Sequence, residues 1–290
     1  MTSSIESPPA VDVVVTSADT TINTTSQCSN DESDDSLINT KIIYRQATND
    51  DLPKILSLQQ LNLPKNISSD ELKSQGFVTV EHDLNILSEM NHPYGHTVAI
   101  ATKTKMQKID GKEPDACEEM EGEDDDEVLI GYALTMTKEF RYHLPILIPM
   151  FDFIDKLSFA ETDKKEDKHM RDDDRVKLGD LSYVVMGQVC VAKSYRGKGV
   201  FGGLYKEMKR RLAPHFVAII TEVATNNTRS LRAHSKVGFI ELDRYYQPQQ
   251  QHEDDEDESN EAAATTTPST TADNDKQGTC WVVIGMRTTP

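Results

Sequence analysis

The chain alternates between segments with a regular apolar pattern and segments that are almost wholly polar. The apolar pattern occupies 41–102, 128–160, 178–246 and 278–288, and acidic or low-complexity stretches lie between these segments at 103–127, 161–177 and 247–277. Residues 1–40 are polar and acidic and contain neither Lys nor Arg. Such stretches bury too little apolar surface to offset the entropy of ordering. We therefore expect a disordered tail over 1–40 and one domain over 41–288 that carries three loop insertions.

Within the apolar segments, the spacing of hydrophobic residues predicts alternating strands and helices. Strands are predicted where β-branched or continuous apolar runs occur: 41–48, 96–102, 127–137, 181–192, 215–225, 239–246 and 279–287. Helices are predicted from apolar spacing at about 49–61 and 200–212, and from its Asn-Asn-Thr start and Gly238 end at 226–238. Further helical stretches are predicted at about 80–90 and 144–157. The order of strand, helix, strand, helix and strand over 181–246 is typical of an α/β domain.

Charge and cysteine content narrow the class of protein. The 290 residues hold 31 Lys or Arg against 49 Asp or Glu, a formal charge of −18, which disfavours binding of the whole chain to nucleic acid or to an anionic membrane. The 4 Cys residues are widely spaced, so neither a disulfide scaffold nor a zinc cluster is expected. No apolar run is long enough to span a membrane. We expect a cytoplasmic protein, with a nuclear location open.

The acidity is not evenly distributed, and the basic region contains a candidate anion site. Residues 179–246 carry eleven Lys or Arg against five Asp or Glu. Within them, Arg196-Gly197-Lys198-Gly199 separates a predicted strand from a predicted helix. Glycines allow a tight turn and close ligand approach, and the N–H groups at a helix start attract anions. The alternative is an ordinary glycine-rich turn with basic surface residues.

This stretch and a second one resemble the GNAT superfamily of acyl-CoA-dependent N-acyltransferases. Val191-Ala-Lys-Ser-Tyr-Arg-Gly-Lys-Gly-Val-Phe201 is similar to the superfamily's phosphate motif, although Phe201 stands where a small residue is usual. A second motif is matched at Asn227, Ser230, His234, Lys236, Gly238 and Phe239. The runs 76–82 and 186–191 are similar to a bacterial-type subgroup. The resemblance implies the GNAT fold, a mixed central sheet of about six to seven strands flanked by helices.

The resemblance also implies a cofactor site for acetyl-CoA. In GNAT enzymes, the strand before the phosphate motif splays from its neighbour, and its backbone holds the pantetheine arm. Val189, Cys190 and Val191 occupy that place, and one of their N–H groups is the candidate for oxyanion stabilisation. The phosphates would be bound by Arg196, Gly197, Lys198, Gly199, Val200 and Phe201. Asn227 would contact the pantetheine arm or an ordered water, and Ser230 is a further cofactor-binding candidate.

Three residues are candidates for the chemistry of amine acetylation. His234 stands where many members of the superfamily carry a Tyr as general acid, and its alternative role is that of a helix residue satisfied by backbone. Glu222 could accept a proton from the ammonium substrate, or it could be a strand-end charge paired with Arg229 or Arg232. Gln188 would orient substrate or water.

The sequence therefore predicts acetyl transfer from acetyl-CoA to a primary amine, small molecule or peptide, by direct attack in a ternary complex. One alternative is a catalytically silent acyl-CoA-binding module, and another is a phosphate-binding protein unrelated to CoA. We expect a monomer or homodimer without a metal, an inert core thiol at Cys190, and a solvated face at Lys206, Lys209, Arg210 and Arg211. The segment 138–157, with Phe140, Tyr142 and Phe151, is expected to pack in the core or to form part of the acceptor wall.

Overall fold

The computed structural model describes residues 37–74, 78, 80–108, 117–119, 126–158, 176–248 and 278–289. Its strands are β1 (Leu37–Gln46), β2 (Thr97–Lys108), β3 (Cys117–Glu119), β4 (Asp126–Met136), β5 (Tyr183–Val191), β6 (Ala218–Ala224), β7 (Ile240–Pro248) and β8 (Gly278–Arg287). Its α-helices are α1 (Leu52–Gln60), α2 (Ser69–Ser74), α3 (Leu84–Met90), α4 (Ile148–Lys156), α5 (Val200–Leu212) and α6 (Thr228–Lys236). The expected tail as far as residue 36 and most of the three expected insertions lie outside the described residues.

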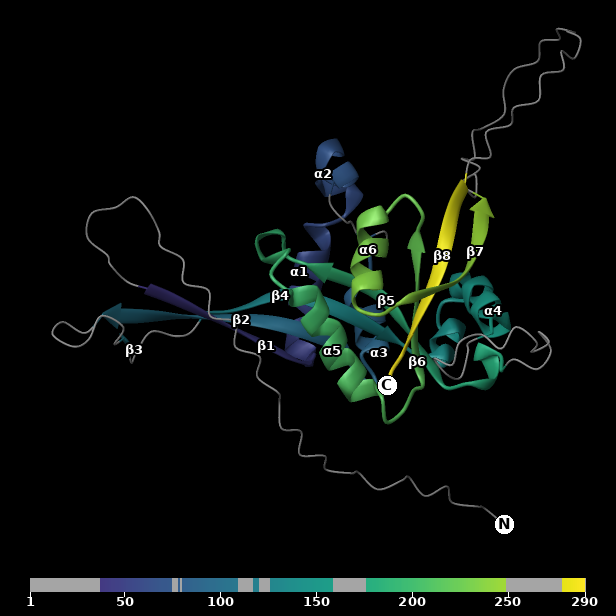
Figure 1. Cartoon of the computed structure of the whole chain (residues 1–290), viewed down its shortest axis with the longest axis horizontal. Helices are drawn as coiled ribbons and strands as arrows, with labels where there is room; N and C mark the ends of the chain where they lie inside the picture. The colour runs from purple at the N-terminus through teal and green to yellow at the C-terminus, as the bar shows by residue number, and fades with distance from the viewer. Residues whose placement is uncertain are drawn as a thin grey trace, which may run out of the picture.

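The strands form one mixed sheet in the order β1-β2-β4-β5-β6-β8-β7, and the short β3 pairs with β2 (Figure 1). The pair β5–β6 is parallel, and the other described pairs are antiparallel. The predicted fold class, a mixed sheet of about six to seven strands flanked by helices, is confirmed by this seven-strand path.

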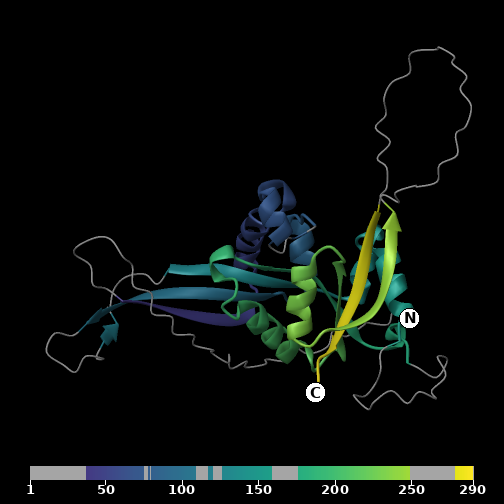
Figure 2. The ribbon, with the colours of Figure 1, turned by 45° about the horizontal axis from the view of Figure 1, so that its top comes forward.

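Helices cover both faces of the sheet, as Figures 1 and 2 show from two directions. One face carries α1, α3 and α4, whose apolar side chains share a core with inward residues of the sheet such as Tyr132 and Val185. The opposite face carries α5 and α6, packed on residues such as Met186 and Ile219. Because β5 lies in the middle of the sheet with helices on both sides, its residues are apolar on both faces, as the continuous run at 181–192 predicts.

Two local differences from the predicted elements have simple causes. The helix predicted at 80–90 begins only at Leu84, because the Asp83 side chain caps it by accepting a hydrogen bond of 2.9 Å from the Ile86 N–H. Strand β2 continues to Lys108, inside the stretch expected to be a loop, because β1 pairs with it from Gln46 to Leu37. Strand β4 has a bulge beside Gly131: Gly131 faces Ala99, but Leu129 faces the next residue, Ile100.

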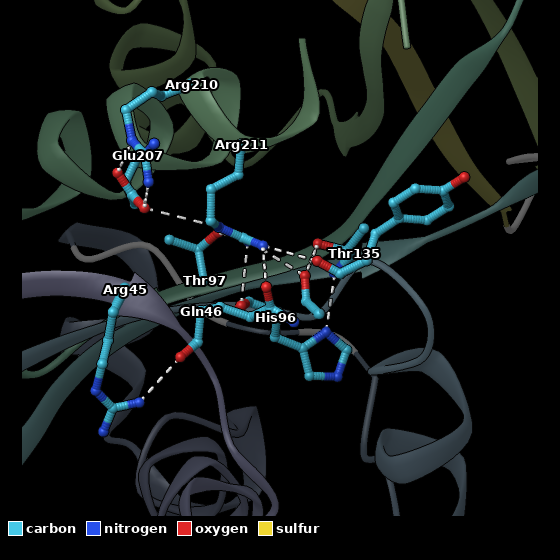
Figure 3. A network of polar contacts seen from close by, with 10 residues as sticks. Arg45, Gln46, His96, Thr97, Thr135, Glu207, Arg210 and Arg211 are labelled. Atoms are coloured by element: carbon cyan, nitrogen blue, oxygen red, sulfur yellow. Dashed lines mark hydrogen bonds and ion pairs between the residues drawn. The ribbon is translucent and has the colours of Figure 1, made fainter. Parts of the chain in front are cut away.

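The basic end of α5 differs from the expected solvated face (Figure 3). Lys206 and Arg210 are exposed, but the Arg211 side chain is only 9% exposed. Its guanidinium donates to the Tyr94 carbonyl at 2.7 Å and to the Thr97 hydroxyl at 2.7 Å. Arg211 is buried because it satisfies polar groups of the segment that leads into β2, and this burial lowers its pKa to about 10. It fastens α5 to the sheet and takes no part in a basic surface.

Candidate functional site

Strands β5 and β6 diverge in the middle of the sheet. They pair at Tyr183–Val185 with Ala218–Ile220, yet β5 runs on to Val191 and β6 to Ala224. At the point of divergence, the Thr221 hydroxyl donates a 2.8 Å hydrogen bond to the Met186 carbonyl. A bulge in β5 follows, because the β4 partners Ala133 and Thr135 face Val189 and Met186 respectively. The divergence opens a gap between two neighbouring strands of a sheet that is otherwise continuous.

The Arg-Gly-Lys-Gly turn connects the open end of β5 to α5. Gly197 and Gly199 have φ of +78° and +83°, a backbone conformation that disfavours other residues, and Gly199 is the N-cap of α5. A Cβ at either glycine would meet no atom within 4 Å. The first N–H groups of a helix have no intrahelical partner, and the helix dipole makes that end positive. The turn therefore offers N–H donors beside open space, as an anionic ligand requires.

The Arg196 side chain is hydrogen-bonded to two segments that border the turn. Its Nε donates to the Val191 carbonyl at 3.0 Å, and its Nη2 donates to Asn62 Oδ1. The side chain is half-buried, and burial lowers its pKa, although the guanidinium stays charged near neutral pH. Arg196 thus ties the end of β5 to the loop after α1 and keeps a positive charge beside the turn.

A cavity of about 260 Å³ lies between the turn and α6. Most of the predicted cofactor residues line it: Val189, Cys190, Val191, Arg196, Gly197, Gly199, Val200, Phe201, Asn227 and Ser230. Lys198 does not, because its ammonium group lies over the Tyr195 ring, 5.4 Å from the centroid. Sequence reasoning missed the other lining residues, which are Asn62, Val78, Tyr195, Arg229 and Ala233. Tyr195 and Arg229 lie within the two motif stretches, and that position was the signal available for them.

Asn227 and Cys190 have structural roles that are visible in the same cavity. The Asn227 side chain caps α6 by accepting from the Ser230 N–H at 3.3 Å. Cys190 is 6% exposed, and burial raises the pKa of its thiol to about 12. A thiol with that pKa holds almost no thiolate at neutral pH, so Cys190 is unsuited to nucleophilic attack.

His234 is buried on the face of α6 that packs against α5. Its Nδ1 lies 2.8 Å from the Ser230 carbonyl, which can only accept, so Nδ1 carries the proton and Nε2 accepts from the Tyr205 hydroxyl at 2.7 Å. Burial lowers the pKa of the imidazole to about 4, and the ring is therefore neutral near pH 7. Its one N–H is donated to a backbone carbonyl, so His234 has the geometry of a helix residue whose hydrogen bond is satisfied by backbone.

A larger cavity, of about 770 Å³, lies on the other side of the divergence. Glu222 on β6 lines it, and the Tyr245 hydroxyl from β7 donates a hydrogen bond to the Glu222 carboxylate. Burial raises the pKa of Glu222 although the Tyr245 hydrogen bond opposes that shift. Glu222 therefore has a protein partner other than the arginines considered from the sequence. From the segment 138–157, Phe140 lines this cavity, whereas Phe151 is wholly buried and Tyr142 is 75% exposed.

A small cavity of about 60 Å³ lies between the two larger ones. It shares Val189, Asn227 and Ser230 with the first cavity, and it shares Gly187, Thr221 and Glu222 with the second. The small cavity therefore adjoins both larger cavities at the gap between β5 and β6, and Glu222 lines the small cavity and the larger one.

Gln188 anchors one wall of the larger cavity through a buried network of hydrogen bonds. Its Oε1 accepts from the Tyr132 hydroxyl at 2.6 Å and from Gln59 Nε2 at 2.9 Å. Its Nε2 donates to the Val80 carbonyl at 2.8 Å, and Gln59 Oε1 accepts from the His82 N–H at 2.9 Å. The network fixes the segment before α3, which forms a wall of the larger cavity.

Among the described residues no group of three or more metal-ligating side chains occurs, and no described helix is long and apolar enough to cross a membrane.

Comparison with known proteins gives similarity in structure without similarity in sequence. No protein-family profile and no curated protein sequence matches the chain. Solved structures that resemble it include the ribosomal-protein-S18-alanine N-acetyltransferase from Escherichia coli, with 10% identity, 85% of this chain and 94% of the other covered, and a TM-score of 0.40. A GNAT-family acetyltransferase from Streptococcus pneumoniae has 10% identity, covers 85% and 98%, and scores 0.39. An N-acetyltransferase from Staphylococcus aureus Mu50 has 11% identity, covers 85% and 98%, and scores 0.40.

Proposed function

We propose that this protein is an N-acetyltransferase of the GNAT type, which transfers an acetyl group from acetyl-CoA to a primary amine by direct attack in a ternary complex. The observation that carries the proposal is the divergence of β5 from β6, which begins after Val185 and leads directly to the glycine turn at 197–199. A diverging strand followed by an anion-binding helix start is the arrangement that the motif resemblance implies for a pantetheine and a pyrophosphate.

The residues around the first cavity fit this ligand. The turn borders open space at Gly197 and Gly199, where the N–H groups at the start of α5 are suited to bind phosphate oxygens, and the Arg196 charge offsets phosphate charge. Val189 and the half-buried Phe201 give the cavity apolar surface for the pantetheine arm. Acetyl-CoA, when bound, supplies an acetyl group activated as a thioester.

Backbone geometry favours two of the three predicted oxyanion donors. The Ala192 N–H bonds to the Ile130 carbonyl of β4. Because N–H groups alternate between the two edges of a strand, the Cys190 N–H also faces β4, whereas those of Val189 and Val191 face the gap. We therefore assign oxyanion stabilisation to Val189 or Val191, whose N–H groups are fixed before substrate binds.

Glu222 is suited to take the proton from the attacking amine. Its carboxylate lies where the small cavity meets the larger one, and its raised pKa makes it a stronger base than an exposed glutamate. The Tyr245 hydroxyl holds the carboxylate in place. Gln188 acts as a positioning residue, because its amide oxygen and nitrogen are both hydrogen-bonded within the protein and hold the wall at Val80.

One observation favours the second candidate, a silent acyl-CoA-binding module. His234, which the motif places at the general-acid position, has its single N–H donated to the Ser230 carbonyl and is neutral near pH 7. A module would bind acetyl-CoA without turning it over.

The two candidates are separated by a binding and turnover experiment on the full chain. Acetyl-CoA should raise the melting temperature, and a thiol reagent should detect CoA release that depends on added primary amine. Binding without release on any amine would establish the module. Absence of both would remove the CoA-based proposal altogether.

A further inference from the structure

The size and lining of the larger cavity indicate which kind of amine it can bind, whereas the two sequence motifs do not. Its volume of about 770 Å³ lies in the range of pockets that enclose whole small molecules. Most of its wall comes from apolar side chains of α3, the 138–157 segment and the two terminal strands, among them Ile86, Met90, Phe140, Leu147, Phe153 and Trp281. A wall of this composition gains free energy by covering apolar ligand surface.

The charges in the cavity have one sign. Glu81, Asp83 and Glu222 line it, and among the described lining residues none is Lys or Arg. Lys65, outside the lining, pairs with Glu81 at 2.6 Å, so the negative charge of the wall comes from Asp83 and Glu222. His82 also lines it, and burial lowers the pKa of its imidazole, which favours the neutral form. An ammonium group is therefore stabilised here, whereas a carboxylate or phosphate on the ligand would find no cationic side chain among these residues.

Glu222 and the aromatic wall are in contact through Tyr245. The Tyr245 hydroxyl bonds to the Glu222 carboxylate, and the Tyr245 ring packs on Phe153 with 4.8 Å between the centroids. A ligand whose amine reaches Glu222 thus places the groups next to that amine against Tyr245 and Phe153. This arrangement couples the position of the reacting nitrogen to an apolar substituent a few bonds away.

We propose that the acceptor is a small primary amine that carries a bulky aromatic or aliphatic substituent and no anionic group, such as an arylalkylamine. The proposal rests on the acetyl transfer argued above and adds the substrate class. Attack of the neutral amine nitrogen on the acetyl carbonyl forms the C–N bond and breaks the C–S bond. The amine proton passes to Glu222, and the sulfur leaves with the electron pair of the broken bond.

The test compares four amines with the full chain and acetyl-CoA, with CoA release and acetylated product both measured. The amines are 2-phenylethylamine, phenylalaninamide, phenylalanine and ethylamine. We expect kcat/KM for the first two to exceed that for phenylalanine by about 100-fold, because the carboxylate would be buried without a partner. We expect 2-phenylethylamine to exceed ethylamine by roughly 10-fold or more, because ethylamine lacks the apolar group.

Two variants on α4 test whether a preference for 2-phenylethylamine over ethylamine arises from the cavity wall. Phe153→Ala should reduce the ratio of kcat/KM for 2-phenylethylamine over ethylamine by about 10-fold, whereas Lys156→Ala, an exposed change on the same helix, should leave that ratio unchanged. Thermal melting with and without acetyl-CoA shows that each variant is folded and binds the donor. Turnover in which phenylalanine or ethylamine equals or exceeds 2-phenylethylamine would overturn the substrate class while leaving acetyl transfer intact. Absence of amine-dependent CoA release on any amine would instead refute the proposed function.

Discussion

The hydroxyl of Tyr245 on β7 donates a hydrogen bond to the carboxylate of Glu222 on β6, although β8 lies between these two strands in the sheet. The contact is formed at the edge of the larger cavity, where both side chains project from the same face. Burial raises the pKa of Glu222, and the Tyr245 hydrogen bond limits that rise. The pair thus sets the pH at which Glu222 becomes available as a base.

Tyr245→Phe should move the acid limb of the pH–rate profile. A base is active when deprotonated, so the rate rises with pH through the pKa of Glu222. Removing the hydroxyl removes a hydrogen bond to the charged form, and the pKa rises further. We expect the acid limb of kcat/KM to shift upward by about one pH unit. A profile identical to that of the wild type would contradict the role of the pair.

Glu222→Gln should abolish the acid limb and lower kcat by about 100-fold or more, the range of general-base catalysis. Stability should behave differently from activity. A carboxyl with a folded pKa above its unfolded value favours folding below the unfolded pKa, and that contribution is lost as pH rises through the folded pKa. At neutral pH the glutamine variant should therefore melt no lower than the wild type, and a large loss of melting temperature would show that Glu222 is chiefly structural.

His234→Gln should change the pH dependence of stability and leave that of the rate alone. The buried imidazole has a pKa of about 4, below its unfolded value, so its contribution is present above pH 6.5 and is lost as pH falls from 6.5 to 4. Over that window the wild type should lose about 3 kcal/mol through this residue, measured by urea unfolding at several pH values. The exposed change His215→Gln serves as the control. Loss of the basic limb of the rate profile in His234→Gln would contradict this and would identify His234 as the general acid.

Gly202→Ala and Gly203→Ala should have opposite effects on stability. A Cβ at Gly202 would meet Val237 Cγ1 at 3.9 Å, an ordinary contact, and alanine favours a helix by up to about 1 kcal/mol. A Cβ at Gly203 would overlap the Tyr44 ring, so α5 would have to move away from β1, at a cost of about 1–3 kcal/mol or more. Chemical denaturation of both variants checks this, and equal effects would contradict the close approach of α5 to Tyr44.

Gly199→Asp should eliminate acetyl-CoA binding while the fold remains. The aspartate carboxylate would stand beside the proposed pyrophosphate position, and the φ of +83° adds a strain of about 1 kcal/mol. Isothermal titration with acetyl-CoA measures the loss, and Gly202→Ala provides a matched glycine change in the next turn. Unchanged affinity in Gly199→Asp would mean that the anion site lies elsewhere.

Local patterns predicted much of the fold and the outline of the cofactor site. The strand at 181–192, the glycine turn and the α6 start at Asn227 depend on residues adjacent in sequence, so their signals are local. The acceptor side could not be predicted in the same way. Gln59 and Gln188 are 129 positions apart and Tyr245 meets Glu222 across an intervening strand, so those contacts exist only after the sheet is assembled. Arg211 was misplaced for the same reason, since its partners come from the segment before β2.

The most direct test of the proposed donor and acceptor sites is CoA release from acetyl-CoA in the presence and absence of 2-phenylethylamine, with the product identified by mass spectrometry. We expect amine-dependent release with one acetyl group gained per CoA, and loss of that release in Gly199→Asp. Release that is independent of the amine, or full activity in Gly199→Asp, would contradict the placement of donor and acceptor on the two sides of the gap between β5 and β6.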